Sequence, residues 1–263
     1  MSEAGRSGSG PGTPGGRGPG RSFRVEWLAE VDSTNRYVLE AASAGEREGL
    51  VVVADHQREG RGRLGRTWEA APGSSLLLSV LLRPRRPVEQ LHLCTAAVAL
   101  AMADAVRAVA GFAPELKWPN DLLADDRKLA GVLAEVELGA SGAVRAVVVG
   151  VGINVTDHAI PPDLAATATA CNVVAGRSID RRSLFDAFLL HLDTRLDSPD
   201  SVLLADYRAQ LATIGRAVRV ERPAGPVEGV ALDVDDLGGL VVQADDGRTV
   251  TISAGDVVHL RPR

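Results

Sequence analysis

The segment that decides the fold is "ELKWPNDLLADDRKLAGVLAEVEL", residues 115–138. Its apolar residues fall into three short runs, which are separated by "WPND" and by "ADDR". Pro119 fixes its own φ and favours extended backbone at Trp118, so the first break is a rigid corner at the end of a strand. The paired aspartates of the second break suit a tight turn. The segment therefore predicts a strand, a turn, a short strand, a tight acidic turn and a third strand.

This pattern gathers charged groups at one place. The corner carries Lys117, Asn120 and Asp121, and Lys128 follows a few residues later. Two short strands joined by a turn would bring Asp121 and Lys128 onto neighbouring positions. A structural Asp–Lys pair with a capping asparagine would produce the same pattern. The chain's other basic residues are all arginine, and we favour a site that needs compact point charges over chance in an arginine-biased composition.

Outward from this segment, hydrophobic periodicity predicts an α/β domain with a mixed sheet. Strands are expected at residues 23–31, 50–57, 74–84 and 143–155. Helices are expected at residues 32–45, 88–110, 180–196 and 199–213. From residue 215, short alternating runs broken by Gly, Asp and Pro are typical of a small antiparallel barrel. Residues 1–22 have almost nothing to bury, so we expect a disordered tail, a domain over 23–213 and a small β domain over 214–263.

Composition limits the functions that the chain can have. Apolar residues make up 45% and charged residues 24% of its 263 residues, as in ordinary soluble domains. The net charge of −5 gives no general affinity for polyanions, so any phosphate site must be local. The sequence shows neither a charged-then-apolar leader nor an apolar run of about 20 residues, which predicts no signal peptide and no membrane span.

The cysteines and histidines predict neither a disulfide nor a zinc site. Cys94 and Cys171 stand far apart without a C-x-x-C partner, as expected of reduced thiols in a cytoplasmic protein. The five histidines are scattered without metal-ligand spacing. We therefore predict no metal held by the protein itself.

The stretch "GRGRLGRTW" (residues 60–68), called the arginine loop below, is a candidate anion site. Its glycines let backbone N–H groups approach a ligand, and its arginines carry forked donors suited to phosphate or carboxylate. It is not a Walker A sequence, and arginines stand where a dinucleotide-binding turn would not place them. We expect the loop to be disordered when empty and ordered by an anion. An arginine-rich surface loop is the alternative.

Three quieter features accompany these two motifs. "DSTN" (residues 32–35) starts a helix, where its polar side chains serve either as caps or as hydrogen-bonding partners of a neutral head group. Gln57 comes shortly before the arginine loop. "GVGINV" (residues 150–155) ends a buried strand, with Asn154 expected to be exposed at its tip. Each feature is weak in isolation.

Together and in this order, these motifs resemble the biotin protein ligase family. The resemblance covers about residues 23–263, and the arginine loop and the "KWPND…KLAG" segment are its most specific parts. It implies a class II synthetase-like mixed sheet with helices on one side and a C-terminal SH3-like β-barrel. It also implies a two-step reaction: biotin and MgATP give biotinoyl-AMP and pyrophosphate, and a lysine of a biotin carboxyl carrier domain of acyl-CoA carboxylase then displaces AMP.

The resemblance implies four catalytic residues: Lys128, Arg63, Arg66 and Asp121. The cations offset the repulsion between a carboxylate and a triphosphate and stabilise the transfer state. Lys128 reaches both the biotin carboxyl oxygen and the α-phosphate. Asp121 accepts or aims the proton of the incoming lysine, because a free lysine with a pKa of about 10.4 is almost entirely charged at neutral pH.

The implied binding set for biotin and ATP is larger. It comprises Ser33, Thr34, Asn35, Gln57, Gly60, Arg61, Arg63, Trp68, Lys117, Asn120, Lys128, Gly131 and Asn154. Ser33, Thr34 and Gln57, with the backbone of Gly131, are implied to meet the biotin ring and tail. Lys117 and Asn120 are implied to lie near the nucleotide phosphates and their magnesium, and Trp68 to act as a lid.

Two departures from the family pattern bear on function. Only the tail precedes the catalytic region, so we expect a ligase without repressor activity or DNA binding, acting as a monomer or weak homodimer. Residues 157–175 contain no aromatic that could stack on adenine.

Two alternative functions remain: a lipoate or octanoyl ligase of the same fold, and a nucleic-acid-binding module that uses the arginine loop.

Overall fold

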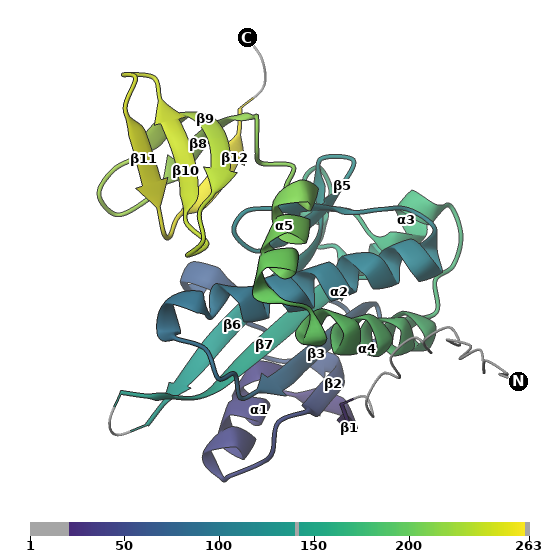
Figure 1. Ribbon diagram of the computed structural model, residues 1–263. Helices are drawn as coiled ribbons and strands as arrows, with labels where there is room; N and C mark the ends of the chain where they lie inside the picture. Colours follow the sequence, from purple (N-terminus) through teal and green to yellow (C-terminus); the bar gives the residue numbers. More distant parts are fainter. Residues whose placement is uncertain (1–20, 140–141, 261–263) are drawn as a thin grey trace, which may run out of the picture.

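The computed structural model describes residues 21–139 and 142–260, so the tail predicted over 1–22 lies almost entirely outside the described residues. The larger sheet has seven strands in the order β1-β2-β3-β7-β6-β5-β4 (Figure 1). These are β1 (Arg24–Val31), β2 (Leu50–Gln57), β3 (Ser75–Leu82), β4 (Glu115–Lys117), β5 (Asp121–Ala124), β6 (Arg127–Leu138) and β7 (Val144–Asn154). β1 and β2 pair in parallel and the other neighbours are antiparallel, so the predicted mixed sheet is confirmed.

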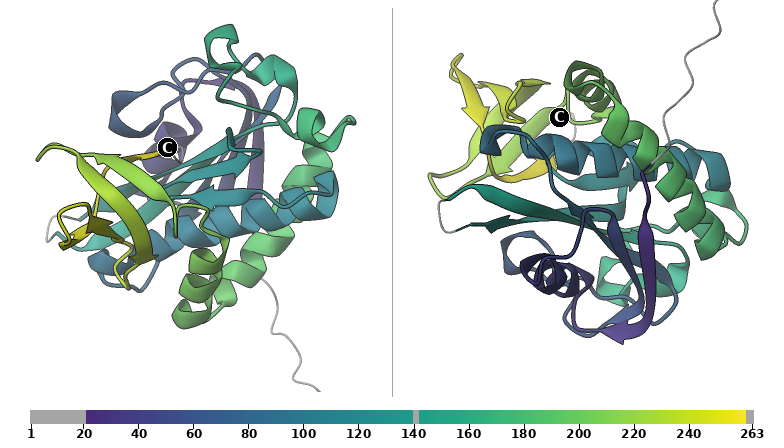
Figure 2. Two further views of the ribbon diagram at one scale, coloured as in Figure 1. Left: turned by 90° about the horizontal axis from the view of Figure 1, so that it is seen from above. Right: turned by 60° about the horizontal axis from the view of Figure 1, so that its bottom comes forward.

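The helices cover both faces of this sheet. They are α1 (Thr34–Ser43), α2 (His92–Ala110), α3 (Cys171–Ala175), α4 (Arg181–Asp197) and α5 (Asp200–Gln210). α2 and α4 lie on one face and α1 lies on the other (Figure 2). The expectation of helices on one side was therefore wrong for α1. Strand alternation is the physical reason, because β2 is apolar on both faces: Val51 joins the main core, whereas Val52 packs with α1.

The segment Val88–Ala110, which contains α2, is a long apolar helical segment. It is long and apolar enough to cross a membrane, with a mean hydropathy of 1.7 over its best 18 residues, but 72% of that window is buried inside the fold. Arg195 of α4 ties the two helices together, with Nη2 2.7 Å from the carboxylate of Asp104 on α2. α2 is thus placed as a core helix.

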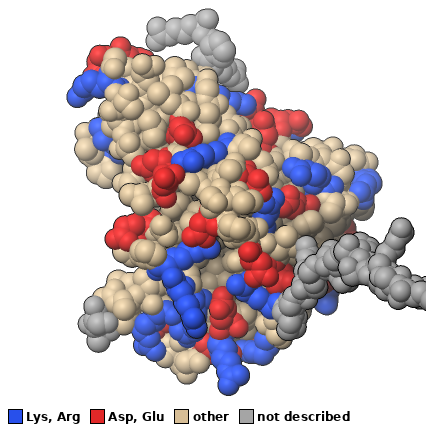
Figure 3. All heavy atoms as spheres, in the orientation of Figure 1, with Lys and Arg blue, Asp and Glu red and all other residues tan. Residues whose placement is uncertain are grey.

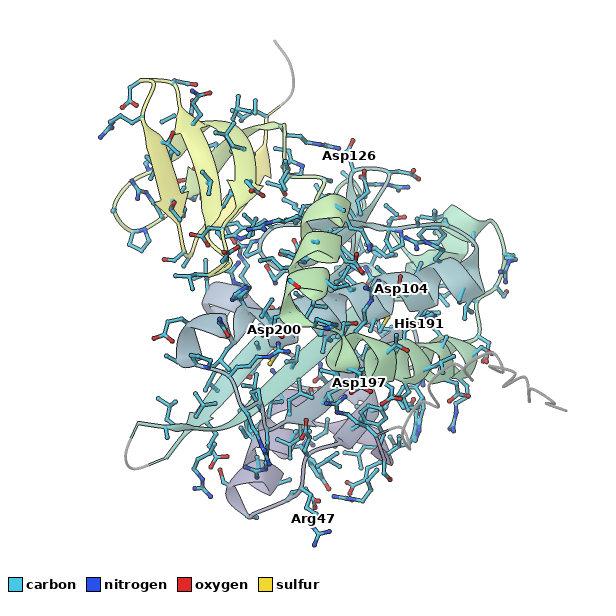
Figure 4. The ribbon with its side chains drawn as sticks, viewed as in Figure 1. Arg47, Asp104, Asp126, His191, Asp197 and Asp200 are labelled. Carbon is cyan, nitrogen blue, oxygen red and sulfur yellow. The ribbon has the colours of Figure 1, made fainter. Side chains whose placement is uncertain are left out.

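The decisive segment folds as its sequence predicted. β4, β5 and β6 follow one another as antiparallel strands, and the Trp118–Pro119 peptide bond is cis. Both residues of the acidic turn have positive φ, 52° at Asp125 and 57° at Asp126, which is the geometry of a tight two-residue hairpin turn. Asp126 projects from the β5–β6 end of the molecule (Figure 4).

A second, smaller sheet follows α5. Its strands are β8 (Ala217–Glu221), β9 (Val227–Val234), β10 (Leu240–Ala244), β11 (Thr249–Ile252) and β12 (Asp256–His259), antiparallel in the order β11-β10-β9-β8-β12. Trp118 anchors this sheet to the larger one, since its Nε1 donates to the carbonyl of Gly238 at 3.0 Å. The helix expected over 199–213 ends at Gln210, because Ala212 N donates to the β4 carbonyl of Leu116 instead.

The surface and the thiols agree with the composition. On the face drawn in Figure 3, acidic and basic side chains are interspersed. Cys94 and Cys171 are buried and free, and burial raises their pKa to about 11 and about 12, so both thiols stay protonated at neutral pH. Over residues 21–139 and 142–260, no group of three or more His, Cys, Asp or Glu side chains is arranged to hold a metal ion.

Candidate functional site

A cleft lies where the arginine loop closes over the sheet. Of the residues predicted from sequence, it is lined by Ser33, Thr34, Asn35, Gln57, Arg61, Arg63, Arg66, Trp68, Asn120, Asp121, Lys128 and Gly131. These residues come from segments up to about a hundred positions apart in the sequence. The guanidinium of Arg63 and the ammonium of Lys128 therefore share one cleft, as the sequence predicted.

The arginine loop is a closed hairpin-like turn. Gly62 N donates to the Arg66 carbonyl at 2.7 Å, and Trp68 N donates to the Gly60 carbonyl at 2.9 Å. An isolated β-bridge joins Arg61 to Thr67, on either side of the short 3₁₀ turn. The loop's own backbone thus turns its arginines toward the cleft, while its ordering by an anion in solution stays a prediction.

Two arginines of the loop contact the small C-terminal sheet. Arg63 Nη1 donates to Asn120 Oδ1 at 3.2 Å and to the Gly255 carbonyl at 3.3 Å. Burial lowers the pKa of Arg63, but from so high a starting value that the group stays charged. Arg66 forms an ion pair with Asp256, at the start of β12. The C-terminal sheet therefore supplies a carboxylate and a carbonyl to the cleft.

Lys128 and Asp121 meet as the hairpin predicted. Lys128 Nζ lies 2.7 Å from Asp121 Oδ1, and a register shift between Leu122 and Leu123 brings the two side chains together. The same ammonium lies 5.7 Å from the centroid of the Trp68 ring. The lysine is thus held between a carboxylate and an aromatic face, with 39% of its side chain still exposed to accept a ligand.

Lys117 stands behind this pair and does not line the cleft. Burial is the main cause that lowers its pKa, the nearby charge of Lys128 lowers it further, and Asp121 and Asp256 raise it. Lys117 therefore contributes positive potential to the cleft from behind. Its predicted contact with nucleotide phosphates stays a prediction.

The opposite wall of the cleft is a network of hydrogen-bonded neutral side chains. Gln57 Oε1 accepts from Thr34 N at 2.7 Å and from Thr34 Oγ1 at 2.9 Å. Ser79 Oγ, on β3, lies 2.8 Å from Thr34 Oγ1 and 2.6 Å from Asn35 Oδ1. Asn35 Nδ2 donates to Glu135 Oε2 at 2.8 Å. This chain of neutral groups, called the neutral wall below, fixes the polar side chains at the start of α1.

Two glycines of β7 make room for these side chains. A Cβ at position 150 would lie 2.2 Å from Asn35 Oδ1, and one at position 152 would lie 2.6 Å from Trp68 Cε2. Such distances are too short for any side chain, so Gly150 and Gly152 let Asn35 and Trp68 pack directly on the strand. The "GVG" motif thus serves the cleft through its missing side chains.

Three predicted residues take other places. Asn154 was expected to be exposed, but it is only 5% exposed and its Nδ2 donates to the Thr169 carbonyl at 3.0 Å, because the chain folds back over the end of β7. Gly60, like Lys117, is absent from the cleft lining, and a Cβ there would lie 2.2 Å from the Trp68 carbonyl. Gly60 therefore supports the loop closure.

Sequence reasoning also missed three residues of the site. Ser79 could have been noticed, since it is the one polar residue that interrupts the apolar run "LLLSVLL" of β3. Glu135 follows the "KLAG" motif by four residues and is one of two alternating acidic residues of β6, with Glu137. Asp256 reaches the cleft from a strand near the end of the chain, so no local pattern could have indicated it.

The arrangement suits one kind of ligand pair. The neutral wall offers hydrogen bonds to an uncharged head group, and the arginine loop with Lys128 offers four cations to anionic groups beside it. Asp121 provides a carboxylate at the same end. Such a cleft can hold a neutral-headed carboxylic acid next to a polyphosphate and offset the repulsion between the two anions.

Comparisons with known proteins agree with this geometry. Residues 27–154 match the biotin/lipoate A/B protein ligase family, and residues 213–260 match the biotin protein ligase C terminal domain. The chain is 41% identical over 254 residues to the biotin–[acetyl-CoA-carboxylase] ligase of Mycobacterium tuberculosis, which covers 93% of this chain and 92% of that protein. It is 32% identical over 226 residues to the bifunctional ligase/repressor BirA of Bacillus spizizenii, covering 82% and 68%.

Solved structures show the same likeness. The biotin protein ligase from Aquifex aeolicus in complex with biotin and ATP superposes with a TM-score of 0.76 at 27% identity, covering 90% of this chain and 99% of that one. The biotin protein ligase from Leishmania major in complex with biotin gives a TM-score of 0.61 at 26% identity, covering 88% and 98%.

Proposed function

Because this chain belongs to the biotin/lipoate A/B protein ligase family, we propose that it joins biotin to a lysine of a biotin carboxyl carrier domain of acyl-CoA carboxylase, using ATP. The observation that carries the proposal is the shared cleft. One wall is a neutral hydrogen-bonded network, and the other brings Arg61, Arg63, Arg66 and Lys128 together. This combination matches a neutral cyclic urea, a carboxylate and a triphosphate.

In the first step, a carboxylate oxygen of biotin attacks the α-phosphorus of MgATP. A new P–O bond forms, the bond to the β-phosphate oxygen breaks, and pyrophosphate leaves with its negative charge. Lys128 and the loop arginines stabilise the charge on the transferring phosphoryl group, since a preorganised donor counts for more inside a cleft than in water. Magnesium enters with the nucleotide as part of the substrate.

In the second step, the carrier lysine attacks the acyl carbon of biotinoyl-AMP. The C–N bond forms, the bond from the acyl carbon to the phosphate oxygen breaks, and AMP leaves. The attacking ammonium must lose its proton, and Asp121 accepts it or aims the amine. Its ion pair with Lys128 at 2.7 Å supports this role, because it keeps the carboxylate next to the proposed catalytic lysine.

Two other functions are less well supported. A lipoate or octanoyl ligase would bind an apolar tail or ring, for which the hydrogen-bonding groups of Thr34 and Gln57 offer no match. A nucleic-acid-binding module would need its arginines on an open basic surface, whereas Arg63 is half-buried between Asn120 and Gly255. Cytoplasmic location, the state as a monomer or weak homodimer, and the lack of DNA binding stay predictions.

Exchange of labelled pyrophosphate into ATP tests the first step. We expect exchange that depends on biotin and is absent with lipoate or octanoate. Addition of a carrier domain should then give a streptavidin-reactive product that a lysine-to-arginine carrier does not form. Exchange supported by lipoate but not by biotin would overturn the proposed substrate, and no acid-dependent exchange at all would overturn the proposed chemistry.

A further inference from the structure

Glu135, outside the cleft lining, joins the two walls of the cleft. It lies on β6, and only 20% of its side chain is exposed. Its Oε1 is 2.9 Å from Arg61 Nη1 of the arginine loop, and its Oε2 accepts a hydrogen bond from Asn35 Nδ2 at 2.8 Å. A single carboxylate therefore holds one cation of the charged wall and one amide of the neutral wall.

Glu135 also fixes which way the Asn35 amide points. Asn35 Nδ2 has two partners, the Leu133 carbonyl at 3.2 Å and the Glu135 carboxylate. Both partners can only accept hydrogen bonds, so the NH₂ group must face them. The carbonyl oxygen of the amide then faces Ser79 Oγ, 2.6 Å away. The amide is fully engaged and leaves no donor for a ligand.

This orientation sets the hydrogen bonds of the next two residues. Ser79 has one hydroxyl proton and is 0% exposed, and it gives that proton to Asn35 Oδ1, which can only accept. The Thr34 hydroxyl then keeps its own proton inside the wall, toward Ser79 Oγ or Gln57 Oε1. Thr34 therefore presents only lone pairs to the cleft, where they can accept an N–H of a ligand.

We infer that Glu135 is a positioning residue for the biotin head group. Through Asn35 and Ser79 it holds Thr34 as a hydrogen-bond acceptor for a urea N–H, and through Arg61 it holds the arginine loop over the same end of the cleft. This inference rests on the proposed function, because it takes biotin as the occupant. Glu135 itself touches no substrate and acts only through its two partners.

Glu135→Gln and Ser79→Ala test this chain, and Glu137→Gln is a matched control. Glu137 lies two residues further on the same face of β6, where it contacts Arg145 and Ser43 away from the cleft. Biotin affinity is measured by titration calorimetry without nucleotide, the KM for ATP by pyrophosphate exchange, and folding by thermal unfolding. Ser79→Ala keeps the test decisive if Glu135→Gln does not fold.

Glu135→Gln and Ser79→Ala should each weaken biotin binding about tenfold, the size of one lost hydrogen bond, and leave the KM for ATP within about twofold. In the double variant the two effects should be less than multiplicative, because both break one chain. Glu137→Gln should bind biotin like the wild type. Multiplicative effects, an equal rise in the KM for ATP, or wild-type affinity in both variants would overturn the inference. Failure of the wild-type chain to bind biotin would instead overturn the proposed function.

Discussion

The two walls of the cleft satisfy their polar groups in opposite ways. On the neutral wall, uncharged groups of neighbouring segments bond to each other, as Gln57 does with Thr34. On the charged wall, three of the four cations are paired with a carboxylate, and Arg63 donates to an amide and a carbonyl oxygen instead. These pairs are Arg61 with Glu135, Arg66 with Asp256 and Lys128 with Asp121.

This difference indicates how one cleft can combine selectivity for its ligand with turnover. A saturated neutral network is rigid, so it can fit a head group without reorganising. The internal carboxylates keep neighbouring cations from repelling one another, and phosphate oxygens of an entering nucleotide can take their places. The neutral wall thus fits one head group without rearrangement. The charged wall exchanges the internal carboxylates for the phosphate oxygens of the nucleotide.

The most severe test of the charged wall is Lys128→Ala. Removal of a preorganised cation from a phosphoryl-transfer site should lower biotin-dependent pyrophosphate exchange by about 10²–10³-fold. Lys128→Arg, which keeps the charge but not the compact ammonium, should restore only a small part of this loss. Thermal unfolding is the control for folding, and near wild-type exchange by either variant would contradict the role of the lysine.

The neutral wall is tested by Gly150→Ala. The added Cβ would lie 2.2 Å from Asn35 Oδ1, so the amide must move and the wall must open. Overpacking of this kind costs about 1–3 kcal/mol, and we expect biotin binding to weaken by about tenfold or more with a lowered unfolding midpoint. Calorimetry and denaturant unfolding measure the two effects.

Gly139→Ala is the matched control for this substitution. Its Cβ would lie closest to the flexible side chain of Arg145, at 3.2 Å, with the Ala143 carbonyl oxygen at an ordinary contact distance of 3.6 Å, and Gly139 directly follows the far end of β6. Biotin affinity in this variant should stay at the wild-type value. Equal losses from both alanines would show that β7 glycines serve general stability rather than the cleft.

The sequence predicted the site best where the chemistry is local. The turn residues and the rigid corner around Pro119 specify the β5–β6 hairpin, and the hairpin in turn specifies the Asp121–Lys128 contact. Asn154 was misjudged because a strand end looks exposed until the following segment folds back on it. Asp256 could not be predicted, since its place depends on how the second sheet docks on the first.

A milder test of the charged wall is Asp256→Asn. This carboxylate competes with phosphate for Arg66, whose side chain is 69% exposed. Exposed ion pairs contribute about 0.2–1 kcal/mol, so the KM for ATP should fall by about twofold to fivefold and depend more strongly on salt. Asp126→Asn, which removes the partner of Arg216 outside the cleft, should leave the KM unchanged. A raised KM in Asp256→Asn would mean that the carboxylate assists nucleotide binding.

The smallest expected effect concerns His259, which is influenced by the positive charges of Lys117 and Arg216. His259 is on β12, and its Nε2 lies 3.2 Å from Thr213 Oγ1 at the junction of the two sheets. Its pKa is lowered to about 4, chiefly by burial and also by the charges of Lys117 and Arg216. The histidine is therefore neutral in the folded protein at neutral pH.

The sign of the resulting pH dependence follows from proton binding. An unfolded histidine titrates near pH 6.5, so between about pH 6.5 and 4 the unfolded chain binds more protons than the folded chain, and stability falls as the pH falls through this window. His259→Gln removes that slope, whereas His191→Gln on α4, away from the junction, should keep it. Urea midpoints at several pH values across the window measure the difference between variant and wild type. Parallel curves for His259→Gln and the wild type would show that folding does not lower the pKa of His259, so that neither its burial nor the charges of Lys117 and Arg216 act on it at the sheet junction.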